Sequence, residues 1–183
     1  MARARLVTGF AEYEPGVARQ QADVLVRPAV VADLTTCAEL IVTRTGGAVE
    51  ARRARLEADL RDPDKYTVVA EAGGEIAGYA LVLGHQISPT DPPGTAPDGY
   101  YLIGLIVAPA WRRHGIGDLL TIERMRWVAE RADEVYYFAN LQNGATLDLH
   151  QRFGFTEITR NFTFPNAPLK PGTCVLLRAP LSR

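Results

Sequence analysis

Long apolar runs are missing from this sequence. No stretch approaches the ~20 consecutive apolar residues that a membrane-spanning helix needs, and the richest run, residues 100–111, is broken by Gly104 and Pro109. Arg3 and Arg5 near the start are not followed by the apolar segment of a secretion signal. We therefore expect a cytoplasmic protein with no membrane partner.

Cysteine is scarce, and neither sign of charge is in large excess. Cys37 and Cys174 are too far apart for the short spacings of metal sites. We interpret both as buried thiols, with a disulfide or a reactive cysteine as alternatives, and we expect no metal. The chain has 20 lysines and arginines against 21 aspartates and glutamates, a formal net charge of -1. Because nucleic-acid-binding proteins usually carry a clear basic excess, we expect no nucleic-acid partner.

The length of 183 residues fits a single domain. Residues 1–22 show no regular periodicity and contain Gly9, Pro15 and Gly16, which interrupt helices and strands. We expect this N-terminal arm to be flexible, or to pack over the fold or over a second subunit in a homodimer. Residues 23–183 are expected to form one domain.

Apolar periodicity predicts an α/β fold with a mixed, largely antiparallel sheet flanked by helices. The turn 71–74 joins two strands as a hairpin, and the continuously apolar segment 100–107 is typical of a central strand buried on both faces. The helix that follows it is apolar nearly all round, which indicates deep burial. Strands are expected over 23–27, 66–70, 76–83, 100–107, 135–140, 155–160 and 174–177. Helices are expected from the cap Asp33 to the stop at Gly46, over 49–61, from Gly117 to about Arg131, and from the cap Asn143 through Phe153.

One loop carries the clearest chemical signal. A helix that begins on a glycine-rich loop offers free backbone N–H groups and a partial positive charge to an anion, and glycine lets the backbone approach closely. The P-loop pattern is absent, and Leu120 stands where a dinucleotide-binding fingerprint has its third glycine. The loop suits a pyrophosphate; the alternative is an ordinary glycine turn with surface arginines. Its residues are Arg112, Arg113, His114, Gly115, Ile116 and Gly117.

The context of this loop resembles the central motif of the GNAT superfamily of N-acetyltransferases. That motif reads R/Q-x-x-G-x-G/A after an apolar strand, here Leu105-Ile106-Val107. The segment 26–29, followed by Asp33 and Leu34, is similar to the first strand and helix of the family, and the resemblance spans about 24–177. A second motif of the family is matched by Asn143, Ala145, Leu149, Gly154 and Phe155.

The resemblance implies a fold, a cosubstrate and a set of contacts. The sheet would splay between its fourth and fifth strands, and acetyl-CoA would lie in the gap. Its pantetheine arm would pair with the backbone of Leu105, Ile106 and Val107, and the N–H of Ile106 would polarise the thioester. Loop 112–117 would hold the pyrophosphate, and Asn143 would bond the arm from the end of the next strand.

Two positions depart from the family pattern. His150 stands where many members carry the tyrosine that protonates the departing thiolate, so His150 is the candidate acid; a solvated histidine without a role is the alternative. Ile103 stands where many members carry a glutamate that serves as the base. Candidate replacements for that base are His85, Asp98 and Glu71, and the amine entering already deprotonated is the other option.

The sequence therefore predicts an acetyl-CoA-dependent N-acetyltransferase in which a small-molecule or peptide amine attacks directly. A catalytically weak acyl-CoA-binding or regulatory module and an acyltransferase for a longer acyl group are the alternatives. The proline-rich loop 88–99 leads into the strand that would hold the acyl group. We expect it to border the acceptor pocket, with Asp91 and Asp98 attracting a cationic amine; a solvated connection is the alternative.

Overall fold

The computed structural model describes residues 23–165, 167, 169–170 and 172–181. The N-terminal arm predicted for residues 1–22 lies outside the described residues. Within the described part, no helix is long and apolar enough to cross a bilayer. Cys37 and Cys174 are both buried free thiols, as predicted, and burial raises the pKa of Cys37 to about 12.

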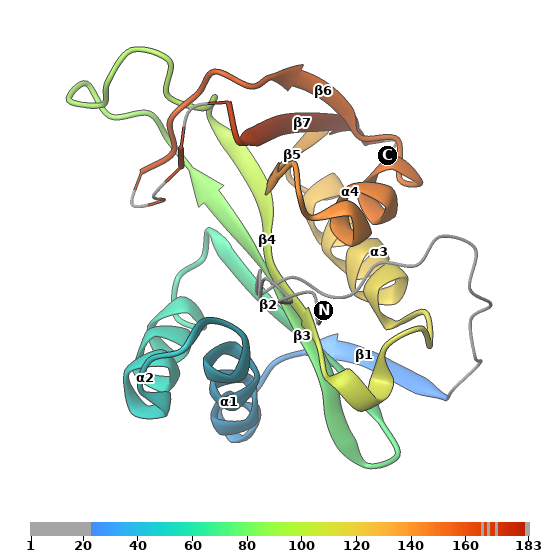
Figure 1. Cartoon of the computed structure of the whole chain (residues 1–183). Helices are drawn as coiled ribbons and strands as arrows, with labels where there is room; N and C mark the ends of the chain where they lie inside the picture. Colours follow the sequence, from blue (N-terminus) through green and yellow to red (C-terminus); the bar gives the residue numbers. More distant parts are fainter. Residues whose placement is uncertain (1–22, 166, 168, 171, 182–183) are drawn as a thin grey trace, which may run out of the picture.

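The described residues form one seven-stranded sheet in the order β1-β2-β3-β4-β5-β7-β6 (Figure 1). All neighbouring strands are antiparallel except β4 and β5, which are parallel. This is the mixed, largely antiparallel α/β fold predicted from the sequence. The strands are β1 (Val24–Pro28), β2 (Lys65–Ala72), β3 (Glu75–His85), β4 (Gly99–Val107), β5 (Glu134–Asn140), β6 (Thr156–Thr159) and β7 (Cys174–Pro180). The helices are η1 (Val31–Asp33), α1 (Leu34–Thr45), α2 (Val49–Asp59), η2 (Pro109–Trp111), α3 (Ile116–Ala129) and α4 (Gly144–Gln151).

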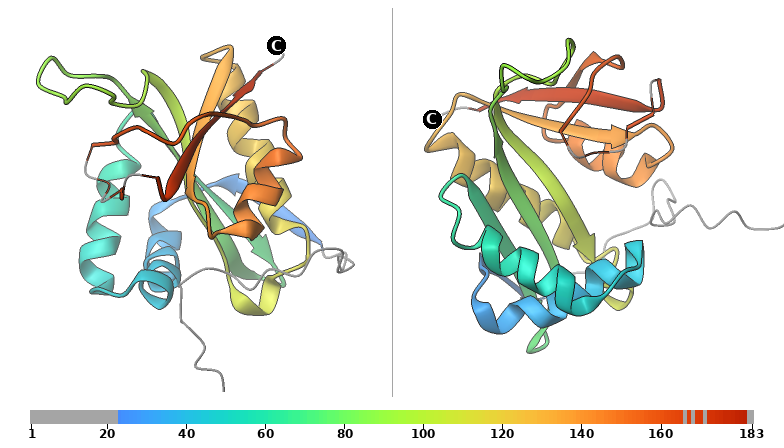
Figure 2. Two further views of the ribbon diagram at one scale, coloured as in Figure 1. Left: turned by 45° about the horizontal axis from the view of Figure 1, so that its top comes forward. Right: turned by 90° about the vertical axis from the view of Figure 1, so that its left-hand side faces the viewer.

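Helices cover both faces of the sheet (Figures 1 and 2). Successive side chains of a strand point to opposite faces, and β2 shows the consequence. Val68 packs with Ile116 and Leu120 of α3, whereas its neighbour Val69 packs with Leu34 of α1 and with α2. The two faces of β2 are thus buried by helices far apart in the sequence.

The start of α1 differs from the prediction. Asp33 precedes the helix, but its side chain does not cap it. Its carboxylate accepts a hydrogen bond from the Val30 backbone N–H at 2.8 Å and pairs with Arg27 at 2.7 Å. The chain enters α1 through the short turn η1, which brings this carboxylate back toward β1. The Arg27 guanidinium holds the pKa of Asp33 below its usual value.

Helix α3 is not buried all round, as its composition had indicated. Leu119 and Ile122 are 38% and 51% exposed. The buried residues follow a single stripe of four-residue steps, because α3 packs against the sheet on one side. That stripe consists of Ile116, Leu120, Arg124 and Val128, with Thr121 beside it.

The sheet opens between β4 and β5, as the family resemblance implied. The two strands pair only at Tyr101 and Tyr136. Beyond that point the rest of β4 has β3 as a partner but not β5, so only Tyr101 and Leu102 of the strand are buried. The prediction that this strand is buried on both faces therefore holds only at Tyr101 and Leu102.

A β-bulge lies in the open half of β4. Leu81 pairs with Ile103 and Tyr79 pairs with Ile106, so β4 has one residue more than β3 over this interval. Gly104 lies in the bulge with φ +66°, and an added Cβ would be 3.0 Å from the Tyr79 hydroxyl. Both constraints favour glycine here. The bulge bends and twists β4 where β5 has separated from it.

Candidate active site

The candidate pyrophosphate loop lies at the N-terminus of α3. Gly115 is the N-cap residue, with φ +79°, and its carbonyl accepts the N–H groups of Asp118 and Leu119 at 3.0 and 3.2 Å. The N–H groups of Ile116 and Gly117 belong to the first turn, which has no intrahelical acceptors for them. Ile116 is 1% exposed and anchors this end of the helix to the sheet. The loop therefore offers backbone donors from a fixed position.

The remaining loop residues are held by local contacts. Arg112 and Arg113 are exposed, and Arg113 has φ +67°, an unusual conformation for a residue with a side chain. The His114 ring contacts the Arg112 carbonyl through Nδ1 at 2.9 Å and lies edge-on to Trp111. His114 thus stabilises the conformation of the loop through its contacts with Arg112 and Trp111.

Helix α4 lies beside the loop. A Cβ added at Gly117 would be 3.4 Å from Leu149 of α4. Arg152, which follows α4, pairs with Asp118 in the first turn of α3 at 2.6 Å and also with Asp148. The pair with Asp118 joins the segment after β5 to the helix that follows β4.

Asn143 is the N-cap residue of α4, as predicted, but its side chain makes no capping bond. Its backbone N–H donates to the Asn140 carbonyl at 2.9 Å. Because loop 112–117 follows β4 and Asn143 follows β5, the two strands that separate each lead into one part of the candidate site.

Two arginines reach the open half of β4. Arg44, at the end of α1, donates from Nη1 to the Leu105 carbonyl at 3.0 Å. Arg124, from α3, donates from Nη1 to the Ile103 carbonyl at 3.3 Å. Leu105, like Ile106 and Val107, is half-buried. Neither arginine was identified from the sequence. The four-residue spacing from Ile116 through Leu120 places Arg124 on the buried stripe of α3, and this was the signal that could have revealed it.

His150 is fully buried and stacked on Tyr137, with ring centroids 3.6 Å apart. Its Nδ1 lies 2.8 Å from the Thr146 carbonyl, so it carries the proton that it donates there. Among the described residues, nothing bonds its Nε2. Burial, followed by the Arg124 cation, lowers the pKa of His150 to about 3. The ring is therefore neutral, and the acid role of His150 stays a prediction.

The candidate bases occupy different places. His85 is buried beside Tyr101 and Phe164, with Nε2 3.1 Å from the Ala96 carbonyl. The Asp98 carboxylate accepts the Ile87 N–H at 2.5 Å. Both therefore lie near the start of β4. Glu71 lies on β2, two strands from β4's open side, and pairs with Arg27 at 3.2 Å.

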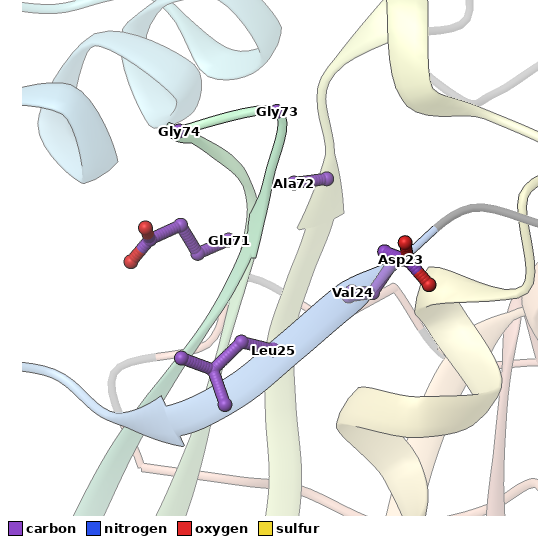
Figure 3. Close-up of a pocket in the computed structure, with 7 residues that line it drawn as sticks. All are labelled: Asp23, Val24, Leu25, Glu71, Ala72, Gly73 and Gly74. Atoms are coloured by element: carbon purple, nitrogen blue, oxygen red, sulfur yellow. The ribbon is translucent and has the colours of Figure 1, made fainter.

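A shallow hollow lies elsewhere, beside β1 and the β2–β3 turn (Figure 3). Its side chains include the carboxylates of Asp23 and Glu71, which point to opposite sides in Figure 3. None of the residues predicted to bind the coenzyme lines it, so it is separate from the candidate coenzyme site. The hollow is lined by Asp23, Val24, Leu25, Glu71, Ala72, Gly73 and Gly74.

The described residues contain no group of three or more histidines, cysteines or carboxylates able to hold a metal ion.

Comparisons with known proteins agree with the fold and the motifs. Residues 34–155 match the model of the Acetyltransferase (GNAT) family. Mycothiol acetyltransferase from Pseudarthrobacter chlorophenolicus is 27% identical over 120 residues, which cover 65% of this chain and 35% of that protein. The chain thus spans about a third of the length of that relative.

Several solved structures share the fold. Ribosomal-protein-alanine N-acetyltransferase from Brucella melitensis is 23% identical with a TM-score of 0.66, over 86% of this chain and 99% of that one. A putative acetyltransferase from Salmonella typhimurium, solved with its cofactor acetyl-CoA, is 20% identical with a TM-score of 0.67, over 87% and 94% of the two chains. Because the family model matches most of the chain and the splayed sheet carries its motif loop, the chain belongs to the GNAT acetyltransferase family.

Proposed function

We propose that this chain transfers the acetyl group of acetyl-CoA to an amine of a small molecule or peptide by direct attack. The observation that supports this most is the position of loop 112–117. It leads into the N-terminus of α3 and is joined through the short turn η2 to the strand that β5 leaves open. A pyrophosphate at the loop would place the pantetheine arm along that open edge. Family membership and the neighbour solved with acetyl-CoA support the same donor.

The arm would add to β4 through backbone hydrogen bonds at Leu105, Ile106 and Val107. The Leu105 carbonyl, which now accepts from Arg44, would exchange that partner for a pantetheine N–H. Running back along the strand at about 3.3 Å per residue, the arm would bring the acyl group near Ile103 and Gly104. A backbone N–H of the open half of β4 would polarise the thioester, and Asn143 would contact the arm from the β5 side.

In this proposal His150 is the acid that protonates the departing sulfur. Its Nε2 would have to carry the proton, since Nδ1 already donates to Thr146. At neutral pH the ring carries only its Nδ1 proton, so Nε2 would first take up a proton from water and then pass it to the sulfur. The amine and the thioester held side by side would supply several kcal/mol of barrier reduction by proximity.

Two measurements test the function. Calorimetry measures the binding of acetyl-CoA, and a turnover assay measures the coenzyme A released in the presence of each of a panel of amines. We expect binding, and release that depends on at least one amine. Absence of binding would refute the proposal.

A catalytically weak acyl-CoA-binding module is the second candidate, favoured by the neutral His150 and by Ile103 in place of a glutamate. That module would be supported if acetyl-CoA binds but no coenzyme A is released with any amine. The same absence of release would have to hold when other acyl-CoA donors replace acetyl-CoA.

Arg112 is expected to contribute through its charge. Replacing it with alanine should weaken acetyl-CoA binding and lower the dependence of affinity on salt concentration, because one cation no longer faces the phosphates. Calorimetric titrations at two salt concentrations measure both quantities. Arg126→Ala, an exposed arginine further along α3, is the matched control and should leave both unchanged. If Arg112→Ala behaves like that control, Arg112 does not face the coenzyme.

The loop between β3 and β4 is proposed to border the acceptor. It projects beyond the sheet in Figure 1, and backbone hydrogen bonds tie it to the β6–β7 connection: Ala96 N–H to Thr163 at 2.9 Å, and Thr163 N–H to Gly94 at 3.0 Å. Asp91 and Asp98 accept backbone N–H groups of the loop itself, so both stabilise its shape.

Replacing residues 88–98 with a short glycine-serine linker tests that role. We expect the KM for the acceptor amine, or the preference among amines, to change. The reason is that the linker cannot make the hydrogen bonds that join this loop to the β6–β7 connection. The Kd of acetyl-CoA should stay the same, since the loop lies at the opposite end of β4 from the pyrophosphate. Unaltered acceptor kinetics would make the loop a connection only.

A further inference from the structure

Arg124 is a fully buried cation with neutral partners. Its side chain is 0% exposed. It donates to the carbonyls of Leu120 at 3.2 Å and Ile103 at 3.3 Å, and to the Thr121 hydroxyl at 3.1 Å. None of these groups carries a charge, and no carboxylate of the described residues pairs with it. Burial lowers the pKa of Arg124 to about 9, so the guanidinium stays protonated at neutral pH.

Such a group is costly to fold. Buried charges are normally paired, and apolar replacement of even a buried ion pair is often neutral or stabilising. Arg126, two residues along the same helix, shows the usual arrangement: it is 63% exposed and pairs with Glu123 at 2.8 Å. Stability alone therefore does not account for an arginine at position 124.

The titratable groups around Arg124 leave its charge uncompensated. Tyr79 from β3, Tyr137 from β5 and His150 from α4 interact with it electrostatically, and Arg44 from α1 acts on both tyrosines. Burial raises the pKa of both tyrosines, that of Tyr137 to about 12, so they are neutral. His150 is neutral as well. Of these groups only Arg124 and Arg44 are charged, and both are cations.

We propose that Arg124 stabilises the coenzyme A thiolate released during acetyl transfer. The inference rests on the proposed function, which places the thioester near Ile103 and Gly104. In the transfer step the amine nitrogen bonds to the carbonyl carbon, the carbon–sulfur bond breaks, and its electron pair goes to sulfur. The proton lost by the nitrogen passes to water. A fixed cation in a site of low dielectric stabilises this charge strongly before a proton reaches the sulfur.

The pKa of the thiol in bound coenzyme A measures this effect without an acceptor. Thiolate absorbance in the ultraviolet, followed against pH, reports it, and the complex with dethio-coenzyme A supplies the background from the protein's own thiols. We expect the thiol pKa in the complex to lie about one unit or more below that of free coenzyme A. Arg124→Met should abolish this shift, whereas Arg124→Lys, which keeps the charge, should retain most of it. Arg126→Met should leave it in place.

Arg124→Met should also keep or raise the melting temperature, because a buried charge is removed. An unshifted thiol pKa in the wild-type complex would overturn the inference while leaving the proposed function intact. A shift that persists in Arg124→Met would overturn it too. If Arg124→Met does not fold, the wild-type and Arg124→Lys measurements decide. If wild-type protein binds no coenzyme A, the proposed function itself fails, and the inference with it.

Discussion

Replacing Gly117 with glutamate is expected to remove most of the affinity for acetyl-CoA, by on the order of 100-fold or more. Gly117 lies in the first turn of α3, and its N–H is among those that would face the pyrophosphate. A carboxylate at this position brings negative charge against negative charge and opposes the helix N-terminus as an anion site. Calorimetric titration with acetyl-CoA measures the loss.

The fold should survive this change. Gly117 has an ordinary helical conformation, and an added Cβ would be in van der Waals contact with Leu149 at 3.4 Å. Gly117→Gln, of the same size without the charge, separates repulsion from bulk and should lose less affinity than Gly117→Glu. Circular dichroism and the melting temperature serve as the check on folding. Wild-type affinity in Gly117→Glu would show that loop 112–117 does not hold the pyrophosphate.

Changing His150 to phenylalanine should lower kcat by roughly 10- to 1000-fold if the imidazole is the acid. Phenylalanine keeps the stacking on Tyr137 and the edge contact with Phe155, and it removes the buried Nε2 that no described group bonds. The melting temperature and the Kd of acetyl-CoA should therefore change little. If kcat falls while the melting temperature and the Kd of acetyl-CoA are preserved, His150 acts in the chemical step and not in packing.

Tyrosine at position 150 provides the matched control. It restores the hydroxyl that many family members carry, and it should recover part of the lost rate. The measurement is kcat with one amine acceptor for the wild type and the two variants. Full kcat in His150→Phe would show that His150 is a packing residue, and it would leave stabilisation of the thiolate to Arg124.

Much of the fold could be predicted because local signals and tertiary packing agree. Gly46 was expected to stop α1, and its N–H bonds the Val42 carbonyl in the structure. The alternation of Val68 and Val69 between two helical layers follows from the strand period alone. Asp33 is the N-cap residue of α1, as predicted, but a 3-10 turn, which leaves no periodic trace, brings its carboxylate to Arg27 in place of a capping bond.

The sequence by itself determined the order of the elements, the family motif and the contiguous loop 112–117, since each depends on residues adjacent in the chain. Only the tertiary structure decided that β5 leaves β4 after Tyr101, that Arg44 and Arg124 reach the carbonyls of the open half, and that His150 is a neutral, buried ring. These features depend on distances between residues far apart in sequence. Burial sets the electrostatics of His150 and Arg124, and burial is a property of the packed interior that neither residue type nor spacing encodes.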